Sequence, residues 1–386
     1  MNKRQNEKNK QITVVLAISL FLCVFFLFLL LVIFRYLWVQ EEKPEQETIL
    51  QEESIEEVDR ETENIEETEE SETTVETEER EIVYNPPSYV FDTSQDTITV
   101  QIPGLGRNYR IAWVSDVHLV TDLEPAEDVF EEYVETLRDR HDRIFQTPEG
   151  IPSNELWGQI IDYLNYEPFD AVIFGGDIMD YCSKSNLDTF LEGYRRLKYD
   201  TEHVMYIRAD HDYGAWYGGD NLTEWRAHEL HAMEIDGHES YDPLQEYDRT
   251  LDFGEFMVIG IDGSTKNMSG DQLETVANKL EEGKPVIIAT HVPYEPEIEN
   301  DKNSLAELSM GVRGQIYYWS PESTNYIPIG RTLDYFNDIY GEQSMVRQVC
   351  AGHLHAEWDG MLTDTVPQHI FTPAYMGAIG VIEVTP

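Results

Sequence analysis

Five short motifs of Asp and His, each directly after a short apolar run, constrain this chain more than any other feature. In α/β sheets, side chains at the carboxyl ends of neighbouring strands project into one crevice. We therefore expect the five motifs to meet in space. They are Ser115-Asp116-Val117-His118, Gly175-Gly176-Asp177-Ile178-Met179-Asp180, Ala209-Asp210-His211-Asp212, Thr290-His291 and Gly352-His353-Leu354-His355.

The apolar runs alternate with amphipathic stretches over the second part of the chain. Short runs predict strands at residues 97–102, 109–114, 171–174, 204–207, 256–261, 286–289, 346–350 and 379–384. Helical periodicity predicts helices at residues 129–137, 155–164, 187–197 and 272–280. Strands that alternate with helices indicate an α/β fold.

No single motif is specific, because a lone histidine at a strand end is usually an ordinary surface or core residue. The set is more informative, since five histidines share the same context in fixed order. We expect the other histidines to be structural or exposed to solvent: His141, His203, His228, His231, His238 and His369.

The order DxH, GDxxD, (N/D)HD, TH and GHxH resembles that of the calcineurin-like metallophosphoesterase superfamily, over about residues 109–386. The resemblance implies a two-sheet sandwich flanked by helices in residues 84–386. It also implies two divalent cations bridged by Asp177. One cation would be bound by Asp116, His118, Asp177 and His355, and the other by Asp177, Asp210, His291 and His353.

Mixed carboxylate and imidazole ligands suit Mn, Fe, Zn or Co. Such a pair of cations clamps phosphate oxygens and lowers the pKa of a shared water, so that hydroxide is available as the nucleophile. The resemblance gives His211 the role of acid toward the leaving oxygen. It gives Asp180 the role of orienting His211, although Asp180 is equally well read as an ordinary loop acid.

The sequence departs from the family pattern at two positions. Asp210 stands where Asn is usual, which adds a negative charge and predicts tighter cation binding. Tyr181 and Cys182 follow the GDxxD motif where protein Ser/Thr phosphatases carry Arg-Gly, and this argues against that subclass.

Two long insertions are candidates for substrate contacts, because long loops at an α/β site are often functional. The first, residues 120–168, contains Arg138, Arg140 and Arg143, for which pairing with nearby acids is the favoured alternative. The second, residues 293–343, contains Arg313, Tyr317, Tyr318, Trp319 and Arg331.

The N-terminal part predicts a location. Residues 12–34 are apolar and uncharged, follow a basic head (residues 1–11), and are long enough to cross a bilayer. Positive flanks stay cytoplasmic, so we expect a single-pass membrane protein with the N-terminus inside and the catalytic domain outside. The alternative is a cleaved signal peptide, but the run is long for one and no small-x-small site follows.

Residues 41–82 form a low-complexity tract with 20 acidic and three basic residues. Such a tract cannot bury enough apolar surface to offset its ordering entropy, so we expect a disordered stalk. The whole chain has a net charge of −48, which disfavours nucleic acid as a partner and a nuclease as the function.

The leading hypothesis is therefore a membrane-anchored hydrolase of small phosphate esters, mono- or diesters, that acts outside the cytoplasm. The alternative is a non-catalytic or weakly active surface protein that uses the same fold to bind a ligand. Three cysteines, Cys23, Cys182 and Cys350, indicate no disulfide framework. We expect Cys182 and Cys350 to be free thiols, with a disulfide between them as the alternative.

Overall fold

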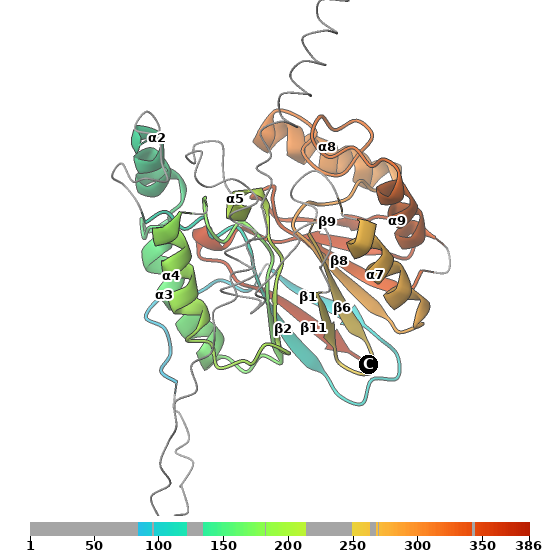
Figure 1. The fold of residues 1–386 in the computed structure, drawn as a ribbon, viewed down its shortest axis with the longest axis horizontal. Coiled ribbons are helices and arrows are strands. Elements are labelled where there is room, and N and C mark those ends of the chain that lie inside the picture. Colours follow the sequence, from blue (N-terminus) through green and yellow to red (C-terminus); the bar gives the residue numbers. More distant parts are fainter. Residues whose placement is uncertain are drawn as a thin grey trace, which may run out of the picture. The chain divides into compact units, whose positions relative to one another are not determined.

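The computed structural model describes residues 84–94, 96–121, 134–181, 183–213, 249–262, 268, 270–341 and 344–386. Two β-sheets and the helices that cover them make up this part of the chain (Figure 1). The predicted head, anchor and stalk at residues 1–11, 12–34 and 41–82 lie outside it. Among the residues described, none of the helices combines the length and apolar character that a membrane crossing requires.

The first sheet has five strands in the order β1-β11-β2-β3-β4. Its central strands β2, β3 and β4 are parallel, β11 is antiparallel to β2, and β1 is parallel to β11. The bounds are β1 (Thr97–Gln101), β2 (Tyr109–Val114), β3 (Ala171–Phe174), β4 (Val204–Tyr206) and β11 (Gly380–Thr385).

The second sheet has six strands in the order β5-β6-β7-β8-β10-β9. Strands β6, β7, β8 and β10 are parallel, while β5 and β9 pair antiparallel at the two edges. The bounds are β5 (Thr250–Asp252), β6 (Met257–Ile261), β7 (Val286–Thr290), β8 (Val346–Ala351), β9 (Trp358–Met361) and β10 (Pro367–Ile370).

The two sheets pack face to face, with an apolar cluster between them that contains residues of both. Alternate residues of a strand point to opposite faces of its sheet. On β2, Ile111 and Trp113 lie in the cluster between the sheets, whereas Ala112 and Val114 lie in the cluster on the other face. Helices α3 (Ser153–Tyr166) and α4 (Lys184–Tyr194) cover that other face.

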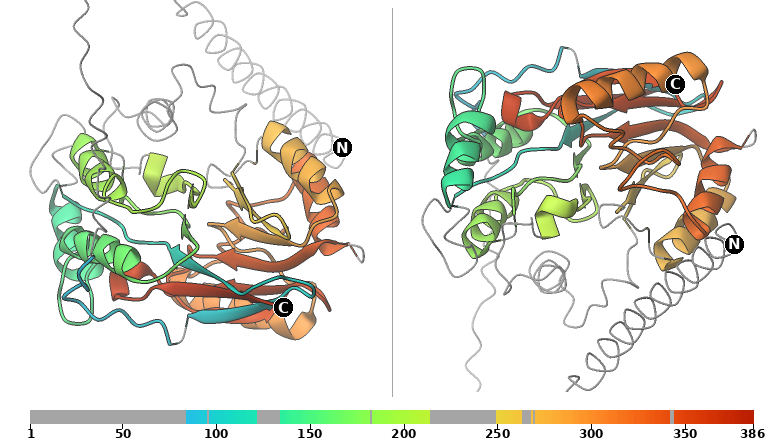
Figure 2. Two further views of the ribbon diagram at one scale, coloured as in Figure 1. Left: turned by 90° about the horizontal axis from the view of Figure 1, so that it is seen from below. Right: turned by 90° about the horizontal axis from the view of Figure 1, so that it is seen from above.

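Helices α7 (Gly270–Glu281), α8 (Glu299–Arg313) and α9 (Arg331–Tyr340) contribute to the apolar cluster on the outer face of the six-stranded sheet. Figure 2 shows the green helices beside the first sheet and the orange helices beside the second. The predicted α/β fold with two sheets and flanking helices is confirmed at this level.

Each predicted strand is present within two residues of its expected bounds. The predicted helices 155–164, 187–197 and 272–280 are α3, α4 and α7. Part of the fourth, residues 129–133, lies outside the described residues, and α2 (Val134–Asp139) continues into the π-helix η2 (Arg140–Ile144).

The expectation of a long loop at residues 293–343 is wrong in part, because this segment contains α8 and α9. Helix α8 buries only Leu305 and Ser309 and exposes charge on its other sides, so its apolar periodicity is weak. The edge strands β5 and β9 and strand β10 were also not predicted, since they are short and contain polar residues.

Cys350 lies buried in β8, and Cys182 lies outside the described residues. The expectation that both are free thiols therefore stays a prediction.

Candidate metal centre

The five motifs meet at the carboxyl ends of strands from both sheets. Asp116 and His118 follow β2, Asp177 follows β3, and Asp210 opens the short helix α5 (Asp210–Tyr213) just after β4. On the other sheet, His291 follows β7, and His353 and His355 follow β8. The packing of the two sheets thus brings together residues as far apart in the sequence as Asp116 and His355.

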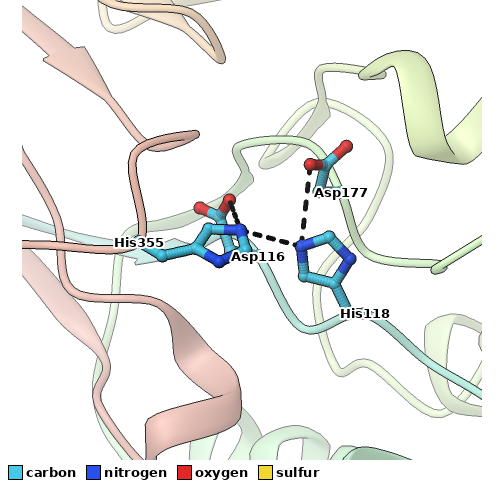
Figure 3. Close-up of side chains that lie close together, drawn as sticks. All are labelled: Asp116, His118, Asp177 and His355. Carbon is cyan, nitrogen blue, oxygen red and sulfur yellow. Dashed lines mark hydrogen bonds and ion pairs between the residues drawn. The ribbon is translucent and has the colours of Figure 1, made fainter. Parts of the chain in front are cut away.

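Four of these residues form a first group whose ligand atoms all lie within 4.8 Å of one another: Asp116, His118, Asp177 and His355. The two Nε2 atoms of His118 and His355 are 3.0 Å apart, and His355 Nε2 is 3.3 Å from Asp116 Oδ1. Figure 3 shows the side chains converging from opposite sides.

Asp177, Asp210, His291 and His353 form a second group of the same size, which shares Asp177 with the first. Several of its ligand atoms are buried and have no hydrogen-bond partner among the described residues: Asp210 Oδ1, His291 Nε2, and both ring nitrogens of His353. His291 Nε2 lies 3.1 Å from Asp177 Oδ2 but outside hydrogen-bond geometry. Buried polar atoms without partners are costly, and a cation at this position would satisfy them.

The backbone is strained at the same residues. Among the described residues, five that are not glycine have positive φ, and all are predicted ligands: Asp116, His118, Asp177, His353 and His355, with φ from 51° to 73°. Such conformations cost roughly 1–3 kcal/mol each and cluster at functional sites. The surrounding structure holds these side chains in place against that cost.

Two glycines of the motifs allow the backbone to approach the ligands closely. Gly176 has φ +94°, and a Cβ there would lie 2.7 Å from His291 Nδ1. A Cβ at Gly352 would clash with Asp116 Oδ2 and Ser115 Oγ. A side chain at either position would displace a ligand.

Asp212 shapes the loop that carries Asp177, although it binds in neither group. Its buried carboxylate accepts hydrogen bonds from the backbone N–H groups of Asp177, Ile178 and Met179 at 2.9–3.0 Å, and from Ala209 at 2.9 Å. Burial and the neighbouring Asp177 raise the pKa of Asp212 to about 7. Sequence reasoning missed this role, and the only signal was the place of Asp212 in the third motif.

The charges of the centre favour a bound cation. Burial opposes the ionised form of Asp210, and the neighbouring Asp177 adds repulsion, so the pKa of Asp210 is raised. Burial also opposes protonation of His291, but the carboxylates of Asp177 and Asp116 outweigh this effect and raise its pKa to about 10. The carboxylates therefore attract positive charge strongly, which a divalent cation supplies better than one proton.

His118 has the electronic form that a metal ligand requires. Burial lowers its pKa to about 4, although the Asp180 carboxylate opposes the shift, so the ring is neutral at pH 7. Because Nδ1 lies 3.0 Å from Asp180 Oδ1 and donates to it, Nε2 carries the free lone pair. The residues present thus fit two divalent cations.

Asp180 contacts His211 with its backbone carbonyl more closely than with its carboxylate. His211 Nδ1 donates to the backbone carbonyl of Asp180 at 2.7 Å, while the nearer carboxylate oxygen is 3.4 Å away. The carboxylate instead accepts from His118 and from Arg140, whose Nε and Nη2 contact it at 2.7 and 2.6 Å. The role of Asp180 in orienting His211 therefore stays a prediction, with the backbone carbonyl as the hydrogen-bond acceptor and the carboxylate at the longer distance of an ion pair.

A third set of close residues, His118, Asp180 and His211, also has ligand atoms within 4.8 Å. The guanidinium of Arg140 already neutralises Asp180 there, and a cation beside it would be repelled. We therefore assign no metal to this set.

The arginines and aromatic residues of the insertions divide between core and site. Tyr318 and Trp319 are buried in the core on the outer face of the second sheet. Arg143 pairs with Asp139 on the surface, as the favoured alternative had it. Tyr317 stacks on the His353 ring at 4.6 Å, and Arg313 Nη2 donates to the His353 carbonyl at 2.5 Å.

The sequence of the chain matches a known protein family. The family model described as calcineurin-like phosphoesterase matches residues 109–357, more than half of the chain. No curated protein sequence matches the chain.

Solved structures show only distant likeness. A dimetal phosphatase from Danio rerio is 15% identical with a TM-score of 0.40, over 69% of this chain and 88% of that one. A phosphopantetheinyl hydrolase from Mycobacterium tuberculosis is 10% identical with a TM-score of 0.38, over 70% and 91%. A purple acid phosphatase from yellow lupin (Lupinus luteus) seeds is 12% identical with a TM-score of 0.38, over 73% and 46%.

The family of this chain therefore follows from the match over residues 109–357. The family uses two divalent metal ions, and the described residues provide two overlapping ligand groups for them. The resemblance seen in the sequence is confirmed: the chain belongs to the calcineurin-like phosphoesterase family and is a metal-dependent phosphoesterase.

Proposed function

We propose that this protein hydrolyses small phosphate esters outside the cytoplasm, with His211 as the acid and residues 12–34 as its membrane anchor. The observation that carries the chemical part is the position of His211. It lies next to Asp210 and beside His118, with ring centroids 4.9 Å apart, yet it belongs to neither ligand group that shares Asp177. An imidazole so placed is available to the substrate instead of to a cation.

The hydrogen bond of His211 leaves one nitrogen for chemistry. Nδ1 donates to the Asp180 carbonyl, so Nε2 is the atom that can hold and release a proton. Burial opposes the charged form, but in the metal-free protein Asp177 and Asp210 outweigh it and raise the pKa of His211. A protonated His211 can donate to the leaving oxygen of an ester. Two bound cations would supply the complementary chemistry, by neutralising phosphate oxygens and activating a water molecule.

Arg313 supports a phosphate-bearing substrate. It is the last residue of α8, and its guanidinium lies 5.7 Å from the centre of the Tyr317 ring, which itself stacks on His353. No carboxylate of the described residues forms an ion pair with Arg313, in a domain that carries an excess of acids. A guanidinium beside a ligand of the second group is suited to a phosphate oxygen.

The charge of the chain supports a small substrate. The residues after the acidic tract carry about −35 of the net −48 by themselves. Polyanions such as nucleic acids would be repelled by this charge, whereas one small ester can reach the cations and Arg313.

The extracytoplasmic location rests on the sequence of the N-terminal part. The uncharged run at residues 12–34 follows a basic head and precedes an acidic tract, the pattern of an anchor with its N-terminus inside. An extended acidic tract would hold the catalytic domain away from the membrane surface.

A metal analysis and a small panel of esters test the chemical part. The full-length protein should contain a transition metal, and it should hydrolyse p-nitrophenyl phosphate or bis-p-nitrophenyl phosphate when Mn²⁺ is added. Removal of metal by a chelator should abolish turnover, and Mn²⁺ should restore it. A purified protein with no bound metal and no turnover of either ester would contradict the proposal.

Protease treatment of intact host cells tests the location. We expect external protease to remove the catalytic domain and leave a short N-terminal fragment in the membrane fraction. Full-length protein that stays protected until the cells are lysed would overturn the extracytoplasmic part while leaving the chemistry intact.

A further inference from the structure

His118 is held from three sides by a segment outside the five motifs. The segment is residues 140–153, which runs from η2 to the first residue of α3. Phe145 and Ser153 contact the ring face and the backbone of His118 directly. Arg140 reaches the ring nitrogen only through Asp180.

Arg140 acts on the ring nitrogen through Asp180. Its guanidinium donates two hydrogen bonds to the buried Asp180 carboxylate, of 2.7 Å from Nε and 2.6 Å from Nη2. The carboxylate in turn accepts from His118 Nδ1 at 3.0 Å. A two-point arginine–carboxylate contact fixes orientation as well as charge. The direction of the Asp180 side chain, and with it the tautomer and tilt of His118, therefore depends on Arg140.

Phe145 and Ser153 fix the remaining parts of His118. The Phe145 ring lies parallel to the imidazole, with 4.1 Å between centroids and 7° between planes, and it is 2% exposed. The guanidinium of Arg140 lies 4.7 Å from the Phe145 ring, so the two residues also support each other. Ser153 Oγ donates to the His118 carbonyl at 2.7 Å.

This support answers a specific need, because His118 has a φ of +51°. A strained conformation persists only where its surroundings over-determine it. In the second ligand group, His353 also has a stacked ring, that of Tyr317, and a donor to its carbonyl, Arg313. What it lacks is support at the ring nitrogens, which have no hydrogen-bond partner among the described residues, whereas His118 Nδ1 donates to Asp180.

We infer that Arg140, with Phe145, is a positioning residue that preorganises His118 and so sets the cation affinity of the first ligand group. The inference rests on the proposed two-cation phosphoesterase function, but it concerns binding and not turnover. The insertion at residues 120–168 thus supports a metal ligand, in addition to any contact with substrate.

Cobalt titration of the metal-free full-length protein tests the inference. Absorption of bound Co²⁺ reports the coordination of each site. Arg140→Gln should weaken binding to the first ligand group by about 10- to 100-fold, as for other residues that orient metal ligands. Arg140→Lys should weaken binding less than Arg140→Gln does, but its affinity should stay below that of the parent, because a lysine neutralises Asp180 without donating to both of its oxygens.

Arg143→Gln is the matched control. It lies in the same π-helix and removes the same charge, but its exposed guanidinium pairs with Asp139 on the surface. We expect it to bind cobalt like the parent. Equal cobalt affinity in Arg140→Gln and Arg143→Gln, with both proteins folded, would overturn the inference.

Phe145→Leu is a second variant in case Arg140→Gln fails to fold. It keeps the ion pair and removes the stacked ring, so we expect a smaller loss of affinity and an altered Co²⁺ spectrum. An unchanged affinity and spectrum would count against the inference. Because the titration needs no turnover, it also decides the matter if the parent binds two cations but hydrolyses no ester.

Discussion

The imidazole of His211 forms its hydrogen bond with the backbone carbonyl of Asp180 and not with the carboxylate. Nδ1 of His211 lies 2.7 Å from the Asp180 carbonyl oxygen and 3.4 Å from the nearest carboxylate oxygen. The two histidines that contact Asp180 therefore depend on different parts of the same residue. His118 uses the side chain, and His211 uses the main chain.

Replacement of Asp180 by Asn should therefore affect metal binding more than acid catalysis. An amide cannot accept both hydrogen bonds of Arg140 and that of His118, so cation affinity should fall by roughly 10- to 100-fold. The backbone carbonyl of residue 180, to which His211 donates, is unchanged by this substitution. The ratio of rates for esters with good and poor leaving groups should stay close to that of the parent. A large change in that ratio at saturating Mn²⁺ would show that the carboxylate acts on His211 after all.

Replacement of His211 by Gln should have the opposite signature. Loss of a general acid costs about 10²- to 10⁴-fold in rate. The loss of kcat should be large for an alkyl phosphate, whose leaving oxygen needs a proton, and small for p-nitrophenyl phosphate. Metal content measured by elemental analysis should be unchanged. Equal losses for both esters would argue against an acid role.

Asp210→Asn tests the departure from the usual family residue. The carboxylate adds a negative charge to the second ligand group, so the parent should bind its cation more tightly than the variant, by roughly tenfold or about 1.4 kcal/mol. Titration of the metal-free protein with Mn²⁺ measures the difference. Weaker binding by the parent would refute this account of Asp210.

Arg313→Gln tests the proposed substrate contact. Loss of a hydrogen-bonded charge should lower kcat/KM by about 10- to 100-fold, mainly through KM, and should weaken inhibition by inorganic phosphate. Arg107→Gln is a suitable control, because Arg107 is exposed and pairs with Asp170 on the surface. Arg107 precedes β2, whereas Asp116 follows it, so the two residues lie at opposite ends of that strand. The same loss in both variants would point to a general effect of charge.

Stability should depend on pH through His369, a histidine that plays no part in the metal centre. His369 is buried in β10, with Nδ1 2.7 Å from Asp359 and Nε2 3.5 Å from Asp96. Burial opposes protonation, but the two carboxylates outweigh it and raise the pKa of His369 to about 9. Because the folded pKa lies above the unfolded value of about 6.5, the stabilisation is complete below that pH and is lost as pH rises through 9.

Urea unfolding at pH 6 and pH 9.5 measures this contribution. The parent should lose roughly 2 kcal/mol of unfolding free energy between these pH values from this residue, a figure discounted because Asp359 is exposed. His369→Gln should reduce the loss. His203→Gln, at an exposed position, should behave like the parent. An identical pH dependence in all three proteins would exclude His369 as the source.

The sequence predicted most of the centre because its chemistry is local to strand ends. Each ligand follows an apolar run, and the glycines beside Asp177 and His353 mark close backbone approaches. The structure brings the seven predicted ligands into two groups and places His211 beside them.

The residues that support the ligands were harder to predict. Asp212, Arg140 and Phe145 make their contacts across the fold, and nothing in their local sequence indicates the partner. Arg140 was expected to pair with an acid, but the sequence did not show that the acid is Asp180. Helices α8 and α9 were missed because their exposed faces are polar and tertiary packing supplies much of their stability.

By itself, the sequence predicted eight of the strands, the candidate ligand set and the family, because apolar periodicity and the order of Asp and His motifs are properties of the linear chain. Only the tertiary structure decided which hydrogen-bond partners the carboxylate and the backbone carbonyl of Asp180 have. It turned the Asp180 carboxylate toward Arg140 and His118 and left the backbone carbonyl for His211. The physical reason is competition: one carboxylate has few lone pairs, and the distances set by packing decide which donors reach them.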